Sequence, residues 1–348
     1  MPSDLLRLAL PGDPQLAPDG RVFYVLATFD EPADAVRRAI WLAGDGPPRA
    51  FTAGPNDTMP RLSQDGTQLA FVAEREGGKR IYLIPTGGGE ARALSPVADA
   101  IAGLCWSPDG SMLAYAATCP FDRASAPIAL DERSGARHIR RLPYKSDDDG
   151  LLDGRRKHLF TLAIVGGEPL QRTRGDFDVH EPSWSPDGTR LAFCARIGGR
   201  EDGFCEDLHV IELASAELRT LTAREGPVAS PAFSHDGREL AFIGHRKGES
   251  VSGRFDSELL AIPAEGGAIR SLSAELGRSL DDAILYETRG AGGASAPQWS
   301  ADDRELFVLV ADEGACGLRA FARDGTGHRI VAGGERVIYA CSRAPGGT

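Results

Sequence analysis

The sequence predicts an all-β protein, a β-propeller of four-stranded blades, because three patterns recur along its 348 residues. A short motif, in which an aromatic or apolar residue is followed by Ser, Pro, Asp and Gly, is typical of a tight turn between two strands. The motif returns at steps of about 45 residues, the usual size of a propeller blade. A second pair of apolar segments, most often joined by glycines, follows the motif. One such unit cannot bury its faces alone, whereas a ring of units can.

Trp-Ser-Pro-Asp-Gly at 184–188 is the clearest copy of the motif. Pro186 presets φ, the Asp187 carboxylate can accept hydrogen bonds from nearby backbone, and Gly188 tolerates a positive φ. Apolar residues at 191 and 193 follow at the period of two that places them on one face of the next strand. The copy therefore predicts a strand, a tight turn and a second strand.

Six copies of the motif divide the chain. Their turn aspartates are Asp19, Asp65, Asp109, Asp187, Asp236 and Asp302. The first, second and fourth steps between them are 46, 44 and 49 residues, so one blade fits each step. The third and fifth steps are 78 and 66 residues, which predicts an insertion in blade three and a long connection before blade six. The sixth copy is degenerate, since Asp303 stands where the other copies have glycine.

The repeat places six complete blades at about 14–52, 60–95, 102–173, 181–222, 230–273 and 297–332. Residues 1–13 form a lead-in, and the extra residues of blade three, roughly 118–157, fall between its second and third strands. Residues 336–348 would begin a seventh blade without the strands to complete it. Two arrangements follow: a ring with an open gap beside blade one, or a tighter ring closed by six blades.

Composition argues against several functions. The formal net charge of −11 at pH 7 does not suit a nucleic-acid-binding surface. No apolar run approaches the length that spans a membrane, and the first residues lack the pattern of a signal peptide. The six cysteines include no Cys-x-x-Cys pair and no histidine cluster accompanies them. We therefore expect thiols in a reducing compartment and a cytoplasmic protein.

Motifs for catalysis and cofactor binding are absent from the sequence. It holds no Gly-x-Ser-x-Gly, no P-loop and no dinucleotide fingerprint. The acidic run at 147–153 does not have the EF-hand spacing and predicts a solvated turn. We therefore expect no catalytic residue, no metal site and no cofactor in this chain.

Two groups of residues are candidates for a surface that faces the channel, a substrate or a partner. They are Arg137, Arg140, Arg141, Tyr144 and Lys145 in the blade-three insertion, and Asp178, His180 and Glu181 at the entry to the innermost strand of blade four. The cations would repel one another unless carboxylates lie nearby, and Arg suits planar pairing with a carboxylate. Strand entries near the propeller axis can line the central channel.

A structural interpretation is open for both groups. In the insertion, the acids at 131, 132 and 147–149 would neutralise the cations on a solvated hairpin. At blade four, His180 would be a hydrogen-bonding residue of the framework.

The Trp-Ser-Pro-Asp-Gly repeats resemble TolB-like, WD40-like propeller repeats. Those occur in periplasmic Tol-system proteins and in the N-terminal domains of prolyl-oligopeptidase-family serine peptidases. A more specific resemblance lies in Arg-Leu-Pro-Tyr-Lys-Ser-Asp at 141–147, Gly-Arg-Arg-Lys-His-Leu-Phe at 154–160 and Gly-Gly-Glu-Pro at 166–169. Their order is similar to that in the propeller of bacterial acylaminoacyl peptidases, a branch of the prolyl-oligopeptidase family.

That resemblance implies a seven-bladed propeller that caps a C-terminal α/β-hydrolase domain, where the catalytic Ser, Asp and His lie. The region that would match the hydrolase domain is missing from this sequence, so no catalytic residue can be carried over and the chain alone is predicted to be inactive. The implied role is gating: the propeller covers the catalytic domain, admits short acylated peptides and excludes folded proteins.

Two other functions stay open at this point. One is a TolB-like scaffold that binds a protein through a propeller face. The other is an enzyme with its site in the propeller channel, for which the sequence offers no convergent acid–base or metal set. The sequence also leaves the oligomeric state open.

Overall fold

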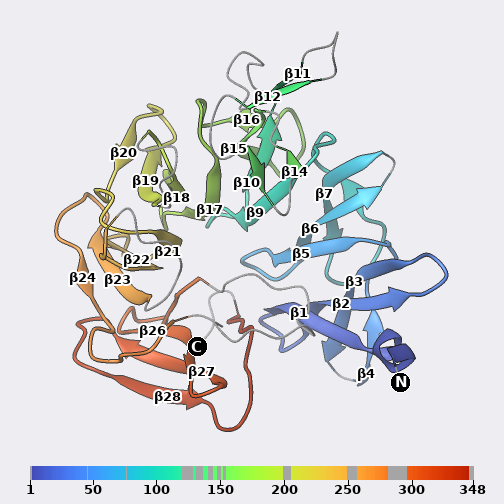
Figure 1. The fold of residues 1–348 in the computed structure, drawn as a ribbon. Coiled ribbons are helices and arrows are strands. Elements are labelled where there is room, and N and C mark those ends of the chain that lie inside the picture. The colour runs from blue at the N-terminus through green and yellow to red at the C-terminus, as the bar shows by residue number, and fades with distance from the viewer. Residues whose placement is uncertain are drawn as a thin grey trace.

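The computed structural model describes residues 2–44, 46–75, 77–119, 128–130, 136–139, 144–146, 150–151, 154–198, 205–248, 257–280 and 296–344. Six four-stranded antiparallel sheets are arranged as blades around a common centre (Figure 1). A short 3-10 helix, η1 (Pro2–Arg7), precedes blade one. The predicted all-β propeller with six complete blades is therefore confirmed.

In every blade the strands follow chain order from the innermost to the outermost. Blade one holds β1 (Ala9–Leu16), β2 (Val22–Asp30), β3 (Ala35–Gly44) and β4 (Gly46–Ala50). Blade two holds β5 (Asp57–Leu62), β6 (Gln68–Arg75), β7 (Gly78–Pro85) and β8 (Arg92–Ala93). Blade three holds β9 (Ile101–Trp106), β10 (Met112–Cys119), β15 (Arg156–Ala163) and β16 (Leu170–Gln171).

The second half of the ring repeats this plan. Blade four holds β17 (Val179–Trp184), β18 (Arg190–Ala195), β19 (Asp207–Glu212) and β20 (Leu218–Thr220). Blade five holds β21 (Val228–Phe233), β22 (Glu239–Gly244), β23 (Glu258–Pro263) and β24 (Arg270–Ser271). Blade six holds β25 (Gln298–Trp299), β26 (Glu305–Asp312), β27 (Ala315–Ala322) and β28 (His328–Ala332).

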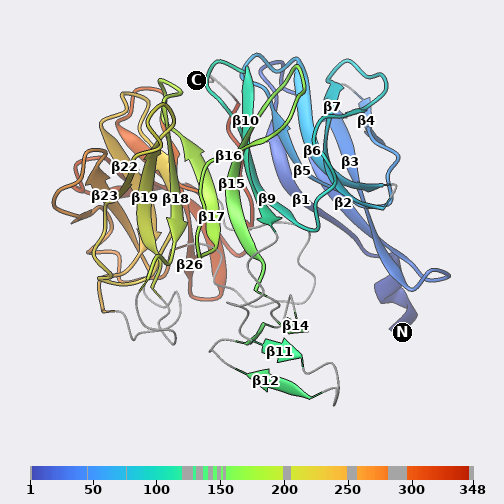
Figure 2. The ribbon, with the colours of Figure 1, turned by 90° about the horizontal axis from the view of Figure 1, so that it is seen from above.

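The insertion of blade three lies between β10 and β15, the second and third strands, as predicted. It contains two small sheets, β11 (Ile128–Leu130) with β12 (Arg137–Ile139), and β13 (Lys145–Ser146) with β14 (Gly150–Leu151). Figure 2 shows β11 and β12 projecting from one side of the ring, away from the C-terminus of the chain. Among the described residues, no helix has the length and apolar character needed to cross a bilayer.

The turn motif folds as its chemistry predicts. In blade four, Ser185 Oγ donates to Asp187 Oδ1 at 2.6 Å, and that oxygen also accepts the Thr189 N–H at 3.0 Å. The Arg190 N–H donates to Ser185 Oγ at 2.9 Å, and Gly188 has a φ of 71°. The same Ser–Asp hydrogen bond is present in the turns of blades two, three, five and six. Ser and Asp recur in the sequence because each satisfies donors that the reversing backbone leaves open.

Asp109 offers a test of this turn. Hydrogen bonds from Ser107 and Ser111 lower the pKa of Asp109 from 3.8 to about 2. We expect Asp109→Asn to lower the free energy of unfolding at pH 7 by about 1 kcal/mol, because a neutral acceptor replaces a charged one. A depressed folded-state pKa means that this stabilisation is present above pH 3.8 and is lost as the pH falls toward 2. Urea titrations at a series of pH values should therefore show that the unfolding free energies of wild type and Asp109→Asn converge as the pH falls toward 2.

Asp99→Asn is the matched control for Asp109→Asn. Asp99 pairs with Arg155 at the surface, where an ion pair contributes little, so its removal should have a small effect at every pH. A difference between wild type and Asp109→Asn that stays constant down to pH about 2.5 would contradict the explanation.

Hydrophobic clusters join neighbouring blades at five of the six seams of the ring. They lie between blades one and two, two and three, three and four, four and five, and five and six. Their centres are fully buried side chains such as Phe23, Phe71, Phe193, Phe242 and Phe321. Among the described residues no such cluster spans blades six and one.

A C-terminal segment crosses that sixth seam instead. We call residues 333–344 the strap. Val337 forms a single parallel bridge with Cys316 at the start of β27, and the strap then runs to β1, where the Tyr339 hydroxyl donates to the Pro11 carbonyl at 2.8 Å. The expected start of a seventh blade takes this form: as far as residue 344, the segment forms no seventh sheet, because it leaves blade six for blade one without turning back to pair with itself.

Candidate functional site

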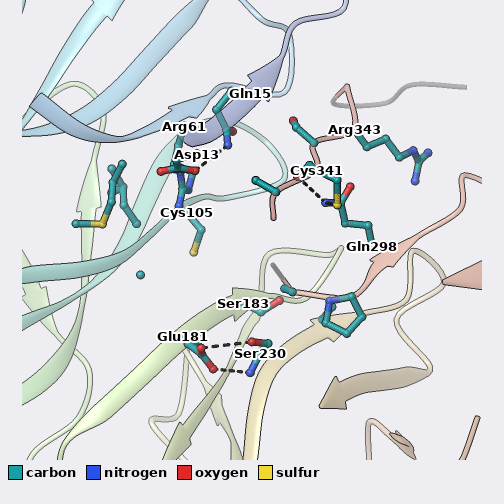
Figure 3. Close-up of a pocket in the computed structure, with 18 of the residues that line it drawn as sticks. Asp13, Gln15, Arg61, Cys105, Glu181, Ser183, Ser230, Gln298, Cys341 and Arg343 are labelled. Atoms are coloured by element: carbon teal, nitrogen blue, oxygen red, sulfur yellow. Dashed lines mark hydrogen bonds and ion pairs between the residues drawn. The ribbon is translucent and has the colours of Figure 1, made fainter. Parts of the chain in front are cut away.

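The innermost strands of the six blades enclose a central cavity of about 780 Å³. Every blade contributes lining residues, and residues 340–344 of the strap close part of the wall (Figure 3). Because all blades meet only at this place, the cavity is the main candidate for a functional site.

A repeated distortion of the innermost strands shapes the cavity wall. Each distorted residue has a positive φ, and its strand loses register with the next one: Asp13, Met59, Gly103, Glu181 and Ser230. In four of these strands a proline follows directly, at 14, 60, 182 and 231. A bulge turns the backbone and re-aims side chains. Here it brings polar side chains of Gln15, Arg61 and Ser183 to the cavity, and Gln298 of the regular strand β25 also lines it.

Two polar contacts in the cavity link neighbouring blades. Arg61 Nη1 of blade two donates hydrogen bonds to both carboxylate oxygens of Asp13 in blade one, at 2.8 and 2.9 Å. Glu181 of blade four accepts hydrogen bonds from the backbone N–H and the hydroxyl of Ser230 in blade five (Figure 3). The cavity carboxylates are therefore neutralised or hydrogen-bonded within the ring.

The three predicted residues of blade four, Asp178, His180 and Glu181, contact different parts of the structure. The Asp178 carboxylate faces blade three, where it accepts the Lys157 N–H at 2.7 Å and pairs with Arg156 at 3.4 Å. His180 Nε2 lies 3.4 Å from Glu206 Oε1, and burial raises the pKa of Glu206. Only the third residue, Glu181, lines the central cavity.

The predicted basic group lies on the insertion. Arg137 on β12 and Lys145 on β13 are exposed, and Tyr144 is half-buried. None of these three lines the central cavity. Arg140 and Arg141 lie outside the described residues.

The cavity offers no activated nucleophile among its described residues. Burial raises the pKa of the Cys105 thiol to about 12, so the thiolate is disfavoured. The Ser230 hydroxyl contacts Glu181, and no histidine is hydrogen-bonded to it or to Ser183 in the described structure. In that part of the chain no group of three His, Cys, Asp or Glu residues could hold a metal ion.

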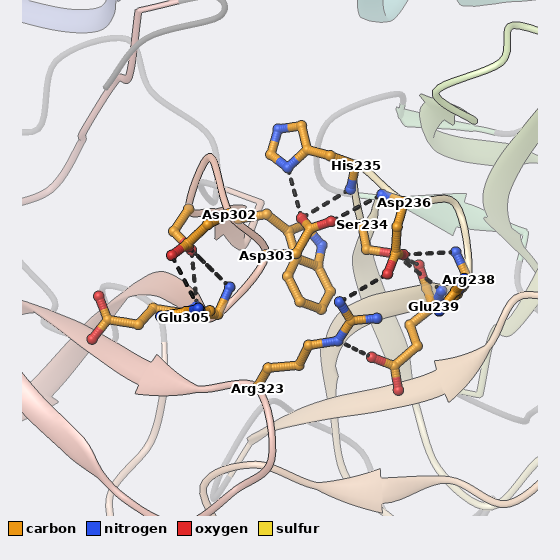
Figure 4. A network of polar contacts seen from close by, with 12 residues as sticks. Ser234, His235, Asp236, Arg238, Glu239, Asp302, Asp303, Glu305 and Arg323 are labelled. Atoms are coloured by element: carbon orange, nitrogen blue, oxygen red, sulfur yellow. Dashed lines mark hydrogen bonds and ion pairs between the residues drawn. The ribbon is translucent and has the colours of Figure 1, made fainter.

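A polar clasp at the cavity rim joins blades five and six (Figure 4). We use clasp for the contact between His235 and Asp303. The Asp303 carboxylate accepts the backbone N–H groups of His235 and Asp236, each at 2.9 Å, and His235 Nδ1 lies 2.7 Å from it. Asp303 has a φ of 55° and is almost fully buried.

The clasp replaces a simpler contact found elsewhere in the ring. The turn glycines Gly66 and Gly237 lie against prolines of the preceding blade, Pro18 and Pro186. At the fifth seam both partners differ, with His in place of proline and Asp in place of glycine. The sequence does show that His235 and Asp303 depart from the repeat. It does not show that they touch, because their turns are about 67 residues apart in the chain and meet only in the fold.

Comparisons with known proteins agree with this architecture. Residues 130–267 match the family model described as "Acylaminoacyl-peptidase, N-terminal beta-propeller domain". The chain is 34% identical over 334 residues to the "Uncharacterized peptidase YuxL" of Bacillus subtilis, which covers 92% of this chain and 50% of YuxL. It is 27% identical over 214 residues to "Dipeptidyl-peptidase 5" of Porphyromonas endodontalis, covering 56% of this chain and 30% of that protein.

Solved structures show the same fold at low identity. The uncomplexed acylaminoacyl peptidase of Pyrococcus horikoshii superimposes with a TM-score of 0.69 at 15% identity, over 97% of this chain and 48% of that chain. The β-propeller domain of the Trilobed protease from Pyrococcus furiosus gives 0.60 at 14% identity, over 97% of this chain and 88% of that one. This chain spans half or less of the curated relatives that it matches.

Proposed function

We propose, from the premise that this chain is an N-terminal β-propeller of the acylaminoacyl-peptidase family, that it gates access to the catalytic domain of a serine peptidase. The observation that carries the proposal is the family match together with a central cavity that lacks an activated nucleophile among its described residues. The chemistry would then belong to a partner, an α/β-hydrolase domain with its own serine, base and oxyanion hole.

The dimensions of the cavity support a role in size selection. A volume of about 780 Å³ lies in the range of sites that hold small ligands. An extended peptide of a few residues fits such a space, whereas a folded domain does not. The proposed substrates are therefore short acylated peptides, which reach the catalytic domain through the propeller.

The projecting insertion is proposed as the contact with that catalytic domain or with the substrate carboxylate. Arg137 and Lys145 are exposed cations on the insertion, although the protein as a whole has a net charge of −11. Exposed cations of this kind favour docking to carboxylates. The insertion is also longer than a blade requires, and surface loops of this kind frequently carry binding functions.

A protein-binding scaffold is the second candidate function. The observation that favours it is the pairing of Asp13 with Arg61 and of Glu181 with Ser230, which leaves these polar groups of the cavity satisfied without a ligand. A scaffold would use an outer face of the ring rather than the cavity.

A chimera tests the gating proposal. We expect a protein in which this chain replaces the matching half of YuxL to hydrolyse short acylated peptides and to spare folded proteins, because the propeller restricts entry by size. The half of YuxL beyond the match, used alone, should lose that discrimination. Hydrolysis is measured with acylated peptides of increasing length and with a folded and an unfolded protein of the same sequence.

The isolated chain is the control for the chimera. It should show no turnover and no reaction with a serine-directed fluorophosphonate probe. Turnover by the purified chain, or a chimera that discriminates no better than the YuxL half alone, would rule out the gating role and leave the scaffold as the better candidate.

A further inference from the structure

We propose that the outer edge of blade six, the side of strand β28 that faces away from β27, pairs with the same edge of a second copy of this chain. Strand β28 is the outermost strand of its blade (Figure 1). The two copies then form a symmetric dimer through antiparallel strands. The proposal goes beyond the gating function, and its test needs no catalytic partner.

The outer strand of every blade has one side without a neighbouring strand in the described chain, and proteins usually protect such edges. Five of the six blades protect theirs with a short strand or with proline. Strands β8, β16 and β24 have two residues each and β20 has three, whereas β4 contains Pro47 and Pro48. Strand β28 has five residues and no proline. Of the six outer edges, it is therefore the one best able to accept another strand.

Two large apolar side chains of β28 are exposed to solvent. Ile330 is 67% exposed and Val331 is 42% exposed, and they are adjacent in the strand. Both side chains are β-branched, which favours the extended backbone that strand pairing requires. A second copy placed against this edge removes their apolar surface from water, which stabilises the contact.

The backbone of β28 presents hydrogen-bonding groups to the outside. At the start of its ladder with β27, the Ala322 N–H donates to the Gly327 carbonyl at 2.9 Å. Residues of an antiparallel strand alternate between bonding to the neighbouring strand and facing away from it. Along the register of this ladder, the N–H and C=O groups of His328 and Ile330 therefore point outward. Each of these residues offers one donor and one acceptor to an antiparallel partner.

The charges on and beside β28 are compensated within one copy, which suits a second copy as the partner. In a twofold contact the same patch meets itself, so an uncompensated charge would face its own kind. Arg329 donates to both carboxylate oxygens of Glu305, at 2.9 and 2.7 Å. The Arg319 guanidinium that contacts His328 pairs with Asp312 at 2.7 Å. Neither cation is left to repel its counterpart in the second copy.

A cavity of about 410 Å³ continues the same edge. Its lining includes Ile330 and Ala332 of β28, Gly333 and Gly334 after it, and Gly317 of β27. The glycines leave space beside the strand because they carry no side chain. Since a twofold contact uses one patch twice, each copy offers both exposed apolar side chains and a cavity that can receive them.

Sedimentation equilibrium of the full chain measures the dimer. A pair of five-residue strands buries less than the roughly 1,200–2,000 Å² typical of stable complexes, so we expect a weak association. Between about 10 µM and 1 mM, the average mass should rise from 37.0 kDa toward twice that value. Hydrogen exchange at the two ends of this range should be slowed in peptides that cover β28 and unchanged in peptides that cover β20.

Ile330→Lys places a cation in the contact, close to its counterpart in the second copy. We expect it to lower the association constant about tenfold or more, and to leave the fold intact because the side chain is exposed. Val331→Lys is a second variant with the same expected loss. Leu218→Lys is the matched control, since Leu218 is 40% exposed on β20, and it should associate like the wild type. Thermal unfolding checks that each variant is folded.

Two outcomes would overturn the proposal. One is a mass that stays at 37.0 kDa up to about 1 mM, because β28 would then bind no second copy. The other is a dimer that persists unchanged in both lysine variants of β28, because the copies would then meet through another surface. Either result would leave the gating proposal to be judged by the chimera.

Discussion

Asp303→Ala is expected to lower the free energy of unfolding by about 2–3 kcal/mol, the cost of removing a buried carboxylate that accepts three hydrogen bonds. The Asp303 side chain is 9% exposed, and its donors are the backbone N–H groups of His235 and Asp236 together with the His235 imidazole. Removal of the carboxylate leaves both backbone donors without their acceptor. Urea titration followed by circular dichroism measures the change.

Two substitutions that restore the proline and glycine of the repeat test whether His235 and Asp303 are energetically coupled. His235→Pro alone removes two of the three donors, and Asp303→Gly alone removes the acceptor, so we expect each to destabilise the protein by about 2 kcal/mol. Together they recreate the proline–glycine contact that Pro186 and Gly237 make at the previous seam. The double variant should therefore recover to within about 1 kcal/mol of wild type. Costs that simply add would show that the two departures are independent.

The surrounding charges give a reason why the fifth seam tolerates such a clasp. Arg323 of blade six donates to Glu239 at 2.6 Å and to Asp236 at 3.0 Å in blade five, and its guanidinium lies over the Trp299 ring (Figure 4). Arg270 also pairs with Glu239, at 2.7 Å. A network of this kind compensates charge across the seam, so one more carboxylate can be accommodated there.

The turn chemistry was enough to predict the blades and the place of the insertion. Ser, Pro, Asp and Gly act within five consecutive residues, so their meaning does not depend on the rest of the fold. The same holds for the apolar run that follows the turn, since Leu191, Ala192 and Phe193 are all fully buried in β18. Local rules of this kind can be applied from sequence alone.

The shape of the cavity wall could not be predicted from the sequence, because it depends on bulges in the innermost strands. Prolines recur before the turns at 14, 60, 182 and 231, which suits the innermost strand of a blade because that strand is an edge of its four-stranded sheet, but the sequence does not show that the residue before each proline has a positive φ. Strand alternation alone places His180 and Glu181 on opposite faces of β17. The bulge adds a positive φ at Glu181 and a loss of register between His180 and Ser183, neither of which the sequence displays.

The strap illustrates a different limit. Residues 337–341 are apolar enough to predict a strand, yet a strand needs a partner, and Val337 finds only one bridging residue, Cys316. Where a segment pairs is a property of the neighbouring edges, which the sequence of the segment does not contain.

Acidification from pH 7.5 to 5.5 is expected to destabilise the ring through two buried histidines. His158 and His209 are 3% and 1% exposed, and burial lowers the pKa of each from its ordinary value of 6.5. His209 Nε2 lies 3.0 Å from the Ala195 carbonyl and Nδ1 lies 3.0 Å from the Thr220 hydroxyl. The neutral ring satisfies both contacts, since Nε2–H donates to the carbonyl and Nδ1 accepts from the hydroxyl.

The direction of the effect follows from proton binding. Because the folded-state pKa of each histidine is lowered, the unfolded chain binds more protons between that pKa and 6.5. Stability is therefore complete above pH 6.5 and falls as the pH drops through this window. Each histidine can contribute a slope of at most about 1.4 kcal/mol of unfolding free energy per pH unit.

His209→Gln should make this pH dependence shallower, because glutamine can donate and accept hydrogen bonds but does not titrate, and His158→Gln/His209→Gln should make it shallower still. His138→Gln, at an exposed position on β12, should keep the wild-type slope. The turn carboxylates Asp109 and Asp236 do not contribute in this window, since they have pKa values of about 2 and lose their contribution only below pH 3.8. Glu206, whose raised pKa acts in the opposite direction, is present in every variant and cancels from the comparison of slopes. A double variant with the wild-type slope between pH 7.5 and 5.5 would show that the acid response arises elsewhere.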